Sequence, residues 1–567
     1  MNAALFLIIG CAVLIVGYIF YGGWLAKKWG VDNSRPTPAH TMEDGKDYCP
    51  AKAPVLMGHH FSSIAGAGPI NGPIQAAVFG WVPVMLWVLI GGIFFGGVHD
   101  FGALFASIRH KGESIGEVIG DAIGAKAKKL FITFAYLTLI LVVAAFASIV
   151  ANTFKATYTA DGAIDYAASS ANASTAIISI MFILMAILFG FFVYRRNAPL
   201  GISTVIGVIG IVVCMVIGLN WHPIYLSYTV WMIIVGLYIG VASVTPVWIL
   251  LQPRDYLSSF LLYAMLALAV VAVFVGHPSM ASLPVVQAET CTTPVFPVLF
   301  TTIACGAISG FHSLVSSGTT SKQLDKETDA KPIAYGGMLL ECVLAVLVLC
   351  AVAGFANANG GDIGVGPTVL FGGGIAGMID PSHGTVYSVL YTLLVLTYSS
   401  FCLTSLDTAT RLARFMFQEF WLDGSKGETP ENVTGFKKVM SNMYVATGIT
   451  VILGVLLGLN GYGKIWALFG SANQLLAALG LLAVATWLGN IGKNNKMFLI
   501  PMVFMLLVTI CSLIINTKTQ IGLITAGGAD WGPYVQAILG VLLVVLAVVL
   551  AIEGFSTISK QKKAAAK

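Results

Sequence analysis

Apolar residues fill one long segment of the chain after another, and polar residues collect in the short stretches between them. Each apolar segment is roughly 20 residues long, which is the length that an α-helix needs to cross about 30 Å of hydrocarbon. Fifteen such helices are predicted, at residues 3–25, 60–79, 82–107, 128–152, 174–193, 200–219, 229–251, 256–276, 297–318, 335–357, 384–408, 441–459, 465–488, 497–516 and 533–553. The pattern therefore predicts an all-α polytopic membrane protein.

The composition excludes an ordinary water-soluble protein. Hydrophobic residues make up 57% of the 567 residues, charged residues only 10%, and the mean hydropathy is +0.88, whereas charged residues are nearer a quarter of a soluble domain. Residues 1–25 lack a basic beginning and a clear cleavage site, so we expect an uncleaved anchor there.

The basic residues predict the orientation of the helices. If the amino terminus lies outside, all of the 30 lysines and arginines fall on the inner side except Lys155, Lys464 and Lys518. Lysine and arginine accumulate in cytoplasmic loops, so the carboxyl terminus is predicted to be cytoplasmic. This excess of basic residues in the inner loops explains the net charge of +5, so the charge does not indicate a nucleic-acid partner. The expected surroundings of the helices are membrane lipids.

Two distant stretches, 61–73 and 300–312, read almost alike, and both are rich in glycine. They lie in the second and ninth predicted helices, an odd separation that gives them opposite orientations. Glycine-rich interruptions at corresponding places in two halves indicate inverted repeats with a binding site between them. We therefore predict a LeuT-like 5+5 inverted repeat with about 15 transmembrane helices, two of them broken. Its units would be a peripheral helix and loop at 1–58, a first repeat at 59–222, two inserted helices at 223–296, a second repeat at 297–490, and two final helices with a tail at 491–567.

The interrupted segments hold the candidate substrate-binding residues. Glycines and prolines in 66–73 should break the helix and free backbone groups, which are tolerated at membrane depth only beside a cavity or within protein. A half-helix beginning at Pro73 would present amides and a positive dipole end to a carboxylate. The alternative is a kinked helix that packs closely through glycine. The candidates are Gly66, Gly68, Asn71, Gly72, Gly306, Gly310, His312 and Ser313.

A second set of candidates could couple transport to an ion. His312 is an ionisable residue at membrane depth, where such residues are usually functional, although a satisfied core histidine is the alternative. Asp100 could form an inner-gate salt bridge or carry a proton. Thr404 and Ser405 could hold sodium beside the broken second helix, or simply bond back along their own helix. Asp407 could pair with Arg411 one turn on. The ion-coupling candidates are His59, His60, His99, Asp100, Glu341, Thr404, Ser405 and Asp407.

Motifs of other function classes are missing from the sequence. No Walker-type GxxxxGK[ST], no HExxH and no pairing of nucleophile and base is present, and the histidines and carboxylates lack metal-ligand spacing. We therefore expect no enzyme, metal centre or cofactor, and an ion gradient as the energy source, with protons favoured over sodium.

The chain resembles the carbon starvation protein A (CstA) family of peptide and pyruvate transporters, of the amino acid, polyamine and organocation superfamily, along almost its whole length. The matching motifs are His59-His-Phe61, Gly66-Ala-Gly-Pro-Ile-Asn-Gly-Pro73, Val98-His-Asp-Phe101, Ser107-Ile-Arg-His-Lys-Gly112, Pro253-Arg-Asp-Tyr-Leu257, Gly310-Phe-His-Ser313, Ser317-Gly-Thr-Thr-Ser-Lys-Gln-Leu324, Thr404-Ser-Leu-Asp-Thr-Ala-Thr-Arg411 and Ala472-Asn-Gln-Leu-Leu476. The resemblance implies uptake of short peptides or pyruvate across a bacterial inner membrane when carbon is scarce, with proton symport the usual proposal.

Two functions are carried forward from the sequence. The first is a symporter in which Asp100, His99 or Glu341 carries the proton and the broken helices hold a small carboxylate-bearing solute or short peptide. The second is a nutrient sensor that binds solute and signals through residues 412–440, where 411–421 looks amphipathic. Oligomeric state does not follow from the sequence.

Overall fold

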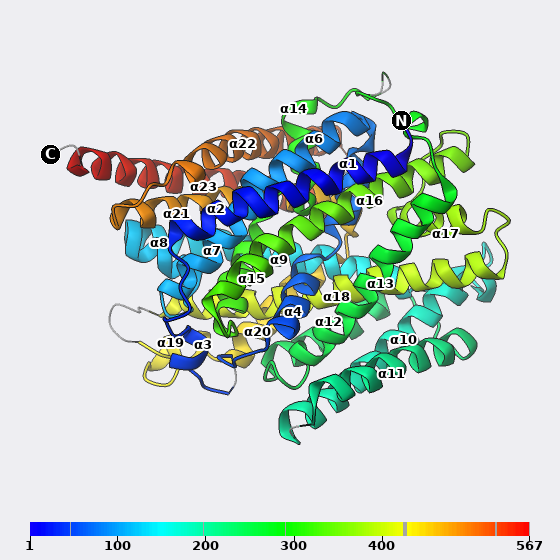
Figure 1. The fold of residues 1–567 in the computed structure, drawn as a ribbon, viewed down its shortest axis with the longest axis horizontal. Coiled ribbons are helices and arrows are strands. Elements are labelled where there is room, and N and C mark those ends of the chain that lie inside the picture. Colours follow the sequence, from blue (N-terminus) through cyan, green and yellow to red (C-terminus); the bar gives the residue numbers. More distant parts are fainter. Residues whose placement is uncertain are drawn as a thin grey trace.

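The chain folds into one bundle of long helices (Figure 1). The computed structural model describes all residues except 46, 197, 288, 290, 423–427, 528–529 and 566–567. The α-helices are α1 (Ala3–Val16), α2 (Gly23–Trp29), α3 (Pro38–Thr41), α4 (Ala53–Ile64), α5 (Gly68–Ala76), α6 (Trp81–Gly91), α7 (Gly97–Arg109), α8 (Ile115–Ile123), α9 (Ala125–Phe154), α10 (Tyr166–Gly190), α11 (Leu200–Asn220), α12 (Tyr228–Val244), α13 (Leu251–Gly276), α14 (Val295–Thr302), α15 (Gly310–Gly318), α16 (Gly336–Ala358), α17 (Gly374–Ile379), α18 (Thr385–Trp421), α19 (Gly435–Met440), α20 (Met443–Gly458), α21 (Tyr462–Asn490), α22 (Lys496–Thr525) and α23 (Trp531–Ala565).

Shorter elements connect or extend these helices. The π-helical turns are η1 (Gly17–Gly22), η3 (Gly92–Gly96), η4 (Phe191–Arg195), η9 (Lys331–Tyr335) and η10 (Val369–Gly373), and the 3-10 turns are η2 (Ala77–Phe79), η5 (Met280–Ser282), η6 (Ala304–Gly306), η7 (Thr320–Lys322) and η8 (Glu327–Asp329). Strands β1 (Thr157–Tyr158) and β2 (Ile164–Asp165) pair antiparallel between α9 and α10, with Thr157 opposite Asp165. This two-residue hairpin is a small departure from the all-α prediction.

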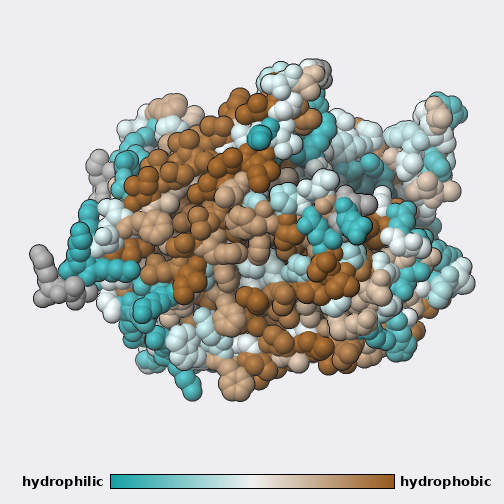
Figure 2. All heavy atoms as spheres, turned by 90° about the horizontal axis from the view of Figure 1, so that it is seen from above, coloured by the Kyte–Doolittle hydropathy of each residue, from teal (hydrophilic) through white to brown (hydrophobic). Residues whose placement is uncertain are grey.

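Within the described residues, 11 helices are long and apolar enough to cross a membrane. Their exposed residues include many large hydrophobic side chains. In Figure 2 hydrophobic residues spread across the middle of the molecule, and hydrophilic residues gather towards its left and right ends. Exposed apolar surface on this scale fits contact with lipid rather than water, and the chain is therefore a multi-pass membrane protein.

The helices run between the two hydrophilic ends of the bundle. The amino terminus lies towards the right end of the bundle in this view, the end that also holds α17, and the carboxyl terminus lies at the left end with α8 (Figure 1). Several helix starts are capped by side chains that accept backbone N–H bonds, among them Asn2, Asp165, Ser227 and Asn442. Such caps replace bonds that the first turn cannot make within its own helix.

The most deeply buried helices surround the two glycine-rich segments. α9 packs against α18, α20 and α21, α16 packs against α5, and α15 packs against α7 and α21. Nearly all of α21 between Ile465 and Leu488 is buried. The segments that echo one another in sequence therefore lie inside the bundle.

The structure corrects the predicted boundaries in two places. α12 ends at Val244 and α13 begins at Leu251, so Arg254 lies within a helix rather than in the inner loop expected between 251 and 256. The connection predicted at 358–383 contains a short helical stretch, Val369–Ile379, which packs against α13 and α16. Hydropathy alone misplaces these two boundaries, because packing against neighbouring helices decides whether a polar or short segment becomes helical.

Candidate functional site

Both glycine-rich segments are broken helices. The first stops at Ile64 and resumes at Gly68, and the second stops at Thr302 and resumes at Gly310. The prediction that Pro73 begins the new half-helix is wrong, because α5 begins at Gly68 with Pro69 in its first turn, and Pro73 lies inside it. Proline at the start of a helix costs little since its missing N–H would have no partner there.

The two breaks lie against each other. A Cβ atom added to Gly68 would lie 2.3 Å from Cys305 Sγ, and one added to Gly72 would lie 2.5 Å from the carbonyl oxygen of Ile303. A side chain at either position would collide with the other segment, so only glycine allows the two segments to approach this closely. Close packing through glycine, the alternative considered above, therefore explains why glycine occupies both positions. The same contacts bring the ends of four half-helices to one place, as a binding site of broken helices requires.

The other predicted glycines also stand at helix contacts. A Cβ atom on Gly66 would lie 2.7 Å from Ser405 Oγ, one on Gly306 would lie 3.1 Å from Ala345 Cβ, and one on Gly310 would lie 2.2 Å from the Asn473 carbonyl oxygen. Asn473 accepts a hydrogen bond from the Phe311 amide at 2.8 Å. This amide–side-chain bond holds the start of α15 against α21.

Asn71 lies in the first turns of α5 and contacts α18. The Tyr398 hydroxyl donates to Asn71 Oδ1 at 3.0 Å, and both side chains are buried. Within the described part of the chain, Asn71 Nδ2 has no hydrogen-bond partner. An unpartnered buried amide carries a cost of about 1–3 kcal/mol, and a bound solute that accepts a hydrogen bond from Nδ2 would remove that cost.

Four ionisable candidates form one buried cluster, which we call the histidine–carboxylate cluster: His99, Asp100, His312 and Glu341. Nδ1 of His99 lies 2.7 Å from one carboxylate oxygen of Asp100, and Nδ1 of His312 lies 2.8 Å from the other. Nε2 of His312 lies 3.5 Å from Glu341 Oε1. All four side chains are fully buried. Asp100 therefore pairs with histidines and not with an arginine, which excludes the inner-gate salt bridge in this conformation.

His60 and Ser313 lie outside this bonded cluster. His60 Nδ1 is 2.8 Å from the Thr320 hydroxyl, and Ser313 donates back to the Gly310 carbonyl at 2.8 Å. The second bond is local to its helix, so the Ser313 hydroxyl is already occupied.

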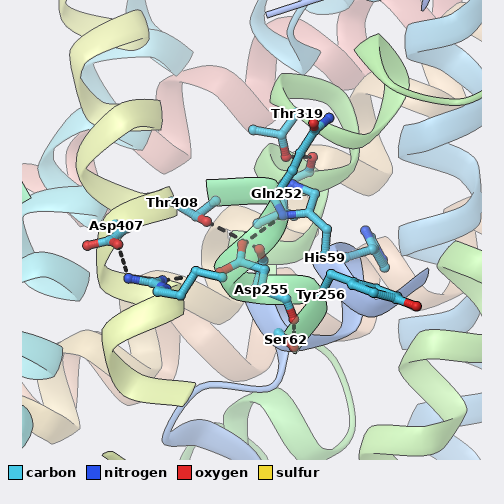
Figure 3. Close-up of polar contacts among 12 residues, drawn as sticks. His59, Ser62, Gln252, Asp255, Tyr256, Thr319, Asp407 and Thr408 are labelled. Atoms are coloured by element: carbon cyan, nitrogen blue, oxygen red, sulfur yellow. Dashed lines mark hydrogen bonds and ion pairs between the residues drawn. The ribbon is translucent and has the colours of Figure 1, made fainter. Parts of the chain in front are cut away.

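A second buried network contains one cation and two carboxylates (Figure 3). Arg254 of α13 bonds to Asp407 of α18 and, at 3.1 Å, to its neighbour Asp255. Asp255 also accepts from His59 Nδ1 at 2.7 Å, and the Tyr238 hydroxyl donates to Asp407 at 2.7 Å. We call these five residues the arginine network. It joins α4, α12, α13 and α18.

The arginine network overturns one predicted pair and adds three residues that the sequence analysis missed. Asp407 bonds to Arg254 and not to Arg411, whose guanidinium donates to the Ala242 carbonyl at 2.9 Å and lies 3.5 Å from Asp47. Arg254, Asp255 and Tyr238 were not candidates. The adjacent charges Arg254 and Asp255 are the only signal in the sequence, and charged residues next to an apolar run usually indicate a loop, whereas here they lie near the start of α13.

Ser405 contacts the end of α4, and Thr404 precedes it in α18. Ser405 donates to the Ser63 carbonyl at 2.8 Å, so this hydroxyl bonds between helices rather than along its own. Thr404 Oγ1 is buried and has no hydrogen-bond partner among the residues that the structure describes. In the part of the chain that the structure describes, no three histidine, cysteine or acidic side chains are grouped as metal ligands.

Comparison with known sequences gives the family. A sequence model of carbon starvation protein CstA matches residues 2–364 and 361–512. The chain belongs to the CstA family. It is 32% identical to the peptide transporter CstA of Bacillus subtilis (strain 168), over 89% of each chain. It is 30% identical to the pyruvate/proton symporter BtsT of Escherichia coli (strain K12), over 88% of this chain and 79% of that one.

Similar solved structures are more distant from this CstA-family chain. The Eremococcus coleocola manganese transporter in complex with an aromatic bis-isothiourea substituted compound has a TM-score of 0.49 at 12% identity, covering 92% of this chain and 99% of that one. MhsT in complex with L-phenylalanine has a TM-score of 0.44 at 12% identity, covering 89% and 99%.

Proposed function

We propose that this CstA-family protein is a proton-coupled symporter that takes up short peptides or pyruvate-like carboxylates across the bacterial inner membrane during carbon starvation. Relatives that align along most of the chain are named as peptide transporters and as a pyruvate/proton symporter. The observation that carries the proposal is the buried histidine–carboxylate cluster at the second broken helix, because it can hold a transferable proton.

The proton position in this cluster follows from its hydrogen bonds. The two oxygens of Asp100 accept from Nδ1 of His99 and of His312, so both nitrogens carry hydrogen. Nε2 of a neutral His312 is then an acceptor that faces Glu341. One proton can sit either on Glu341 or on His312 Nε2. With one shared proton and an ionised Asp100, the cluster carries a single negative charge. A second proton makes the cluster neutral. Because an uncompensated charge is costly in a dry environment, this neutralisation favours uptake of the second proton.

We extend the proposal to the helix plan. The 11 long helices, the shorter α12 and α20, and the two broken helices α4–α5 and α14–α15 account for fifteen crossings. A LeuT-like arrangement of inverted repeats at 59–222 and 297–490 is consistent with opposed breaks that meet inside the bundle. Residues 1–58, 223–296 and 491–567 would lie outside the repeats.

We place the solute at the meeting point of the breaks. Its carboxylate would face the half-helix starts at Gly68 and Gly310, and Asn71 Nδ2 would donate to it. Sodium held by Thr404 Oγ1 and the carbonyls ending α4 is the second candidate for the coupling ion, supported by the unpartnered Thr404 hydroxyl.

The nutrient-sensor function is disfavoured. The relatives are named as transporters. The segment 411–421, which looks amphipathic in sequence, is the end of α18, and its Arg411 and Arg414 are buried. Residues 423–427 of the supposed signalling region lie outside the described residues. We also propose that the protein is not an enzyme.

Uptake into proteoliposomes tests the proposed function. With labelled pyruvate or alanyl-alanine outside, an inward proton gradient should drive accumulation, and an inward sodium gradient at equal pH should not. Vesicles without protein are the control for leakage. Accumulation with sodium alone would replace the proton in the proposal, and the absence of flux under both gradients for both solutes would reject symport of these solutes.

Two cysteines test the proposed orientation. Cys291 is predicted outside and Cys49 inside, so an impermeant maleimide added to intact cells should label Cys291 and spare Cys49. Burial, with Asp44 and Asp47 nearby, raises the pKa of Cys49 to about 11. Because the thiolate reacts, labelling of Cys49 in opened membranes should rise about tenfold per unit between pH 7 and pH 9. A Cys291→Ser variant identifies the outer label, and labelling of Cys49 in sealed cells would reverse the orientation.

A further inference from the structure

A cavity of about 340 Å³ lies at the end of the bundle that holds the amino terminus. The end of α9 and the starts of α10, α18 and α21 surround it. Its polar lining residues include Asn152, Lys155, Thr368, Tyr391, Tyr398 and Tyr462. No aspartate or glutamate is among the described residues that line it. A concave site with one cation, several hydroxyls and aromatic rings suits a small anion with an apolar body.

The charge of Lys155 is free for a ligand. Within the described chain, Lys155 forms no ion pair, whereas Lys464, which stands in a neighbouring cavity, pairs with Asp530 at 3.0 Å. The Lys155 backbone carbonyl accepts from Asn172 at 2.9 Å, which fixes the main chain at this point. Lys155 follows the last turn of α9, where a cation also interacts favourably with the helix dipole. The alternative to ligand binding is therefore that Lys155 only stabilises the end of this helix, and the experiment below tests it.

The cavity at the opposite end of the bundle has the reverse character. Its volume is about 550 Å³, and its lining includes Glu113, Glu117, Asp121 and Glu419. Two lysines also line it: Lys128 is paired with Glu117, and Lys322 lies over the rings of Tyr48 and Phe415. The four acidic side chains therefore outnumber the two basic ones. The cavity with Lys155 therefore attracts an anion, and the cavity with Glu113 and Glu117 repels it. Such a charge difference between the two ends of the bundle can steer an anionic solute towards the first cavity.

Tyr398 connects the first cavity to the broken helices. Its side chain lines the cavity, and its hydroxyl donates to Asn71 Oδ1 at 3.0 Å. Since only 2% of Tyr398 is exposed, the ring closes the inner end of the cavity. Rotation of this ring would open the cavity towards Asn71 and free its Oδ1, so that both polar groups of the amide could bind a solute.

We propose that this cavity is an entry site for the carboxylate of the transported solute, with Lys155 as the binding cation and Tyr398 as the gate to Asn71. The inference rests on the proposed function, because it takes its ligand class from it. Pyruvate and the carboxyl-terminal carboxylate of a dipeptide present the same group, so both should use Lys155.

Equilibrium binding to the purified full-length protein tests the entry site without requiring transport. Labelled pyruvate should bind Lys155→Gln about tenfold more weakly than wild type, the scale of one lost charge-assisted hydrogen bond. Lys155→Arg should keep most of the affinity. Lys464→Gln is the matched control and should bind pyruvate as tightly as wild type does. Both glutamine variants should unfold at the same temperature as wild type, which shows that they are folded.

A neutral ligand sharpens the test. Competition by pyruvamide, which lacks the carboxylate, should not depend on Lys155, and added salt should weaken pyruvate binding more in wild type than in Lys155→Gln. Equal pyruvate affinity in wild type and Lys155→Gln, or no binding by wild type, would overturn the entry site. Lys155-dependent binding without any flux in proteoliposomes would keep the site and reject the symporter, so the two failures are distinguishable.

Discussion

Replacing Asp100 with asparagine is expected to abolish proton-driven accumulation while leaving solute exchange intact. Asp100 joins His99 to His312 through its two oxygens. Asparagine keeps the size of the side chain but lacks the negative charge that holds both histidine N–H groups. Without that charge the cluster with one proton is already neutral, and a second proton would leave an uncompensated positive charge in a dry environment. A gradient of one pH unit supports about tenfold accumulation per coupled proton, because both correspond to ~1.4 kcal/mol. In Asp100→Asn this ratio should fall to about one.

The measurement compares two fluxes in the same proteoliposomes. Accumulation of labelled pyruvate is followed under a pH gradient, and exchange of internal for external pyruvate is followed at equal pH. Glu553→Gln is the control, since Glu553 pairs with Lys126 on partly exposed surface away from the cluster. Full accumulation by Asp100→Asn would remove Asp100 from proton coupling, and loss of both fluxes would assign it to binding or folding instead.

Replacing Arg254 with methionine is expected to lower the free energy of unfolding more than any other substitution proposed here. Arg254 contacts Asp255 and Asp407 where none of the three side chains is more than 1% exposed. Removing the cation leaves two carboxylates in a dry environment, and breaking a buried pair in this way typically costs about 3–5 kcal/mol. The apparent unfolding temperature of the detergent-purified protein should fall clearly below that of wild type.

A double variant separates the loss of charge balance from the loss of packing. Arg254→Met combined with Asp407→Asn removes one of the uncompensated charges, and Asp255 keeps its bond to His59, so part of the stability should return. Lys126→Met is the control, because its ion pair is exposed and such pairs contribute about 0–1 kcal/mol. If Arg254→Met unfolds at the same temperature as Lys126→Met, the arginine network does not stabilise this conformation.

The sequence predicted the features that depend on local composition. Segments of membrane-spanning length follow from hydropathy, and the interruptions at Gly66–Pro73 and near Gly306 follow from residues that disfavour a continuous helix. The family also followed from ordered motifs along the chain. Asn473, a polar residue of the buried helix α21, accepts a hydrogen bond from the Phe311 amide, since a buried polar side chain needs a partner.

The partners of the charged residues could not be predicted in the same way. Asp407 is four residues from Arg411, a spacing that favours a pair on an exposed helix, but it bonds to Arg254 across 153 residues of sequence. Likewise, His312 and Asp100 are 212 residues apart and meet only because α7 and α15 pack together. The position of Pro73 inside α5 was also missed, since Pro69 already starts that helix.

The sequence by itself determined that this protein is helical, enters a membrane and interrupts two of its helices with glycine. These properties are set by transfer of side chains from water and by backbone preferences, which act over a few residues at a time. The tertiary structure alone decided that the two breaks touch, that two histidines share the carboxylate of Asp100, and that Arg254 stands between two aspartates. Buried polar groups need partners at hydrogen-bond distance, and helix packing determines which distant residues come that close.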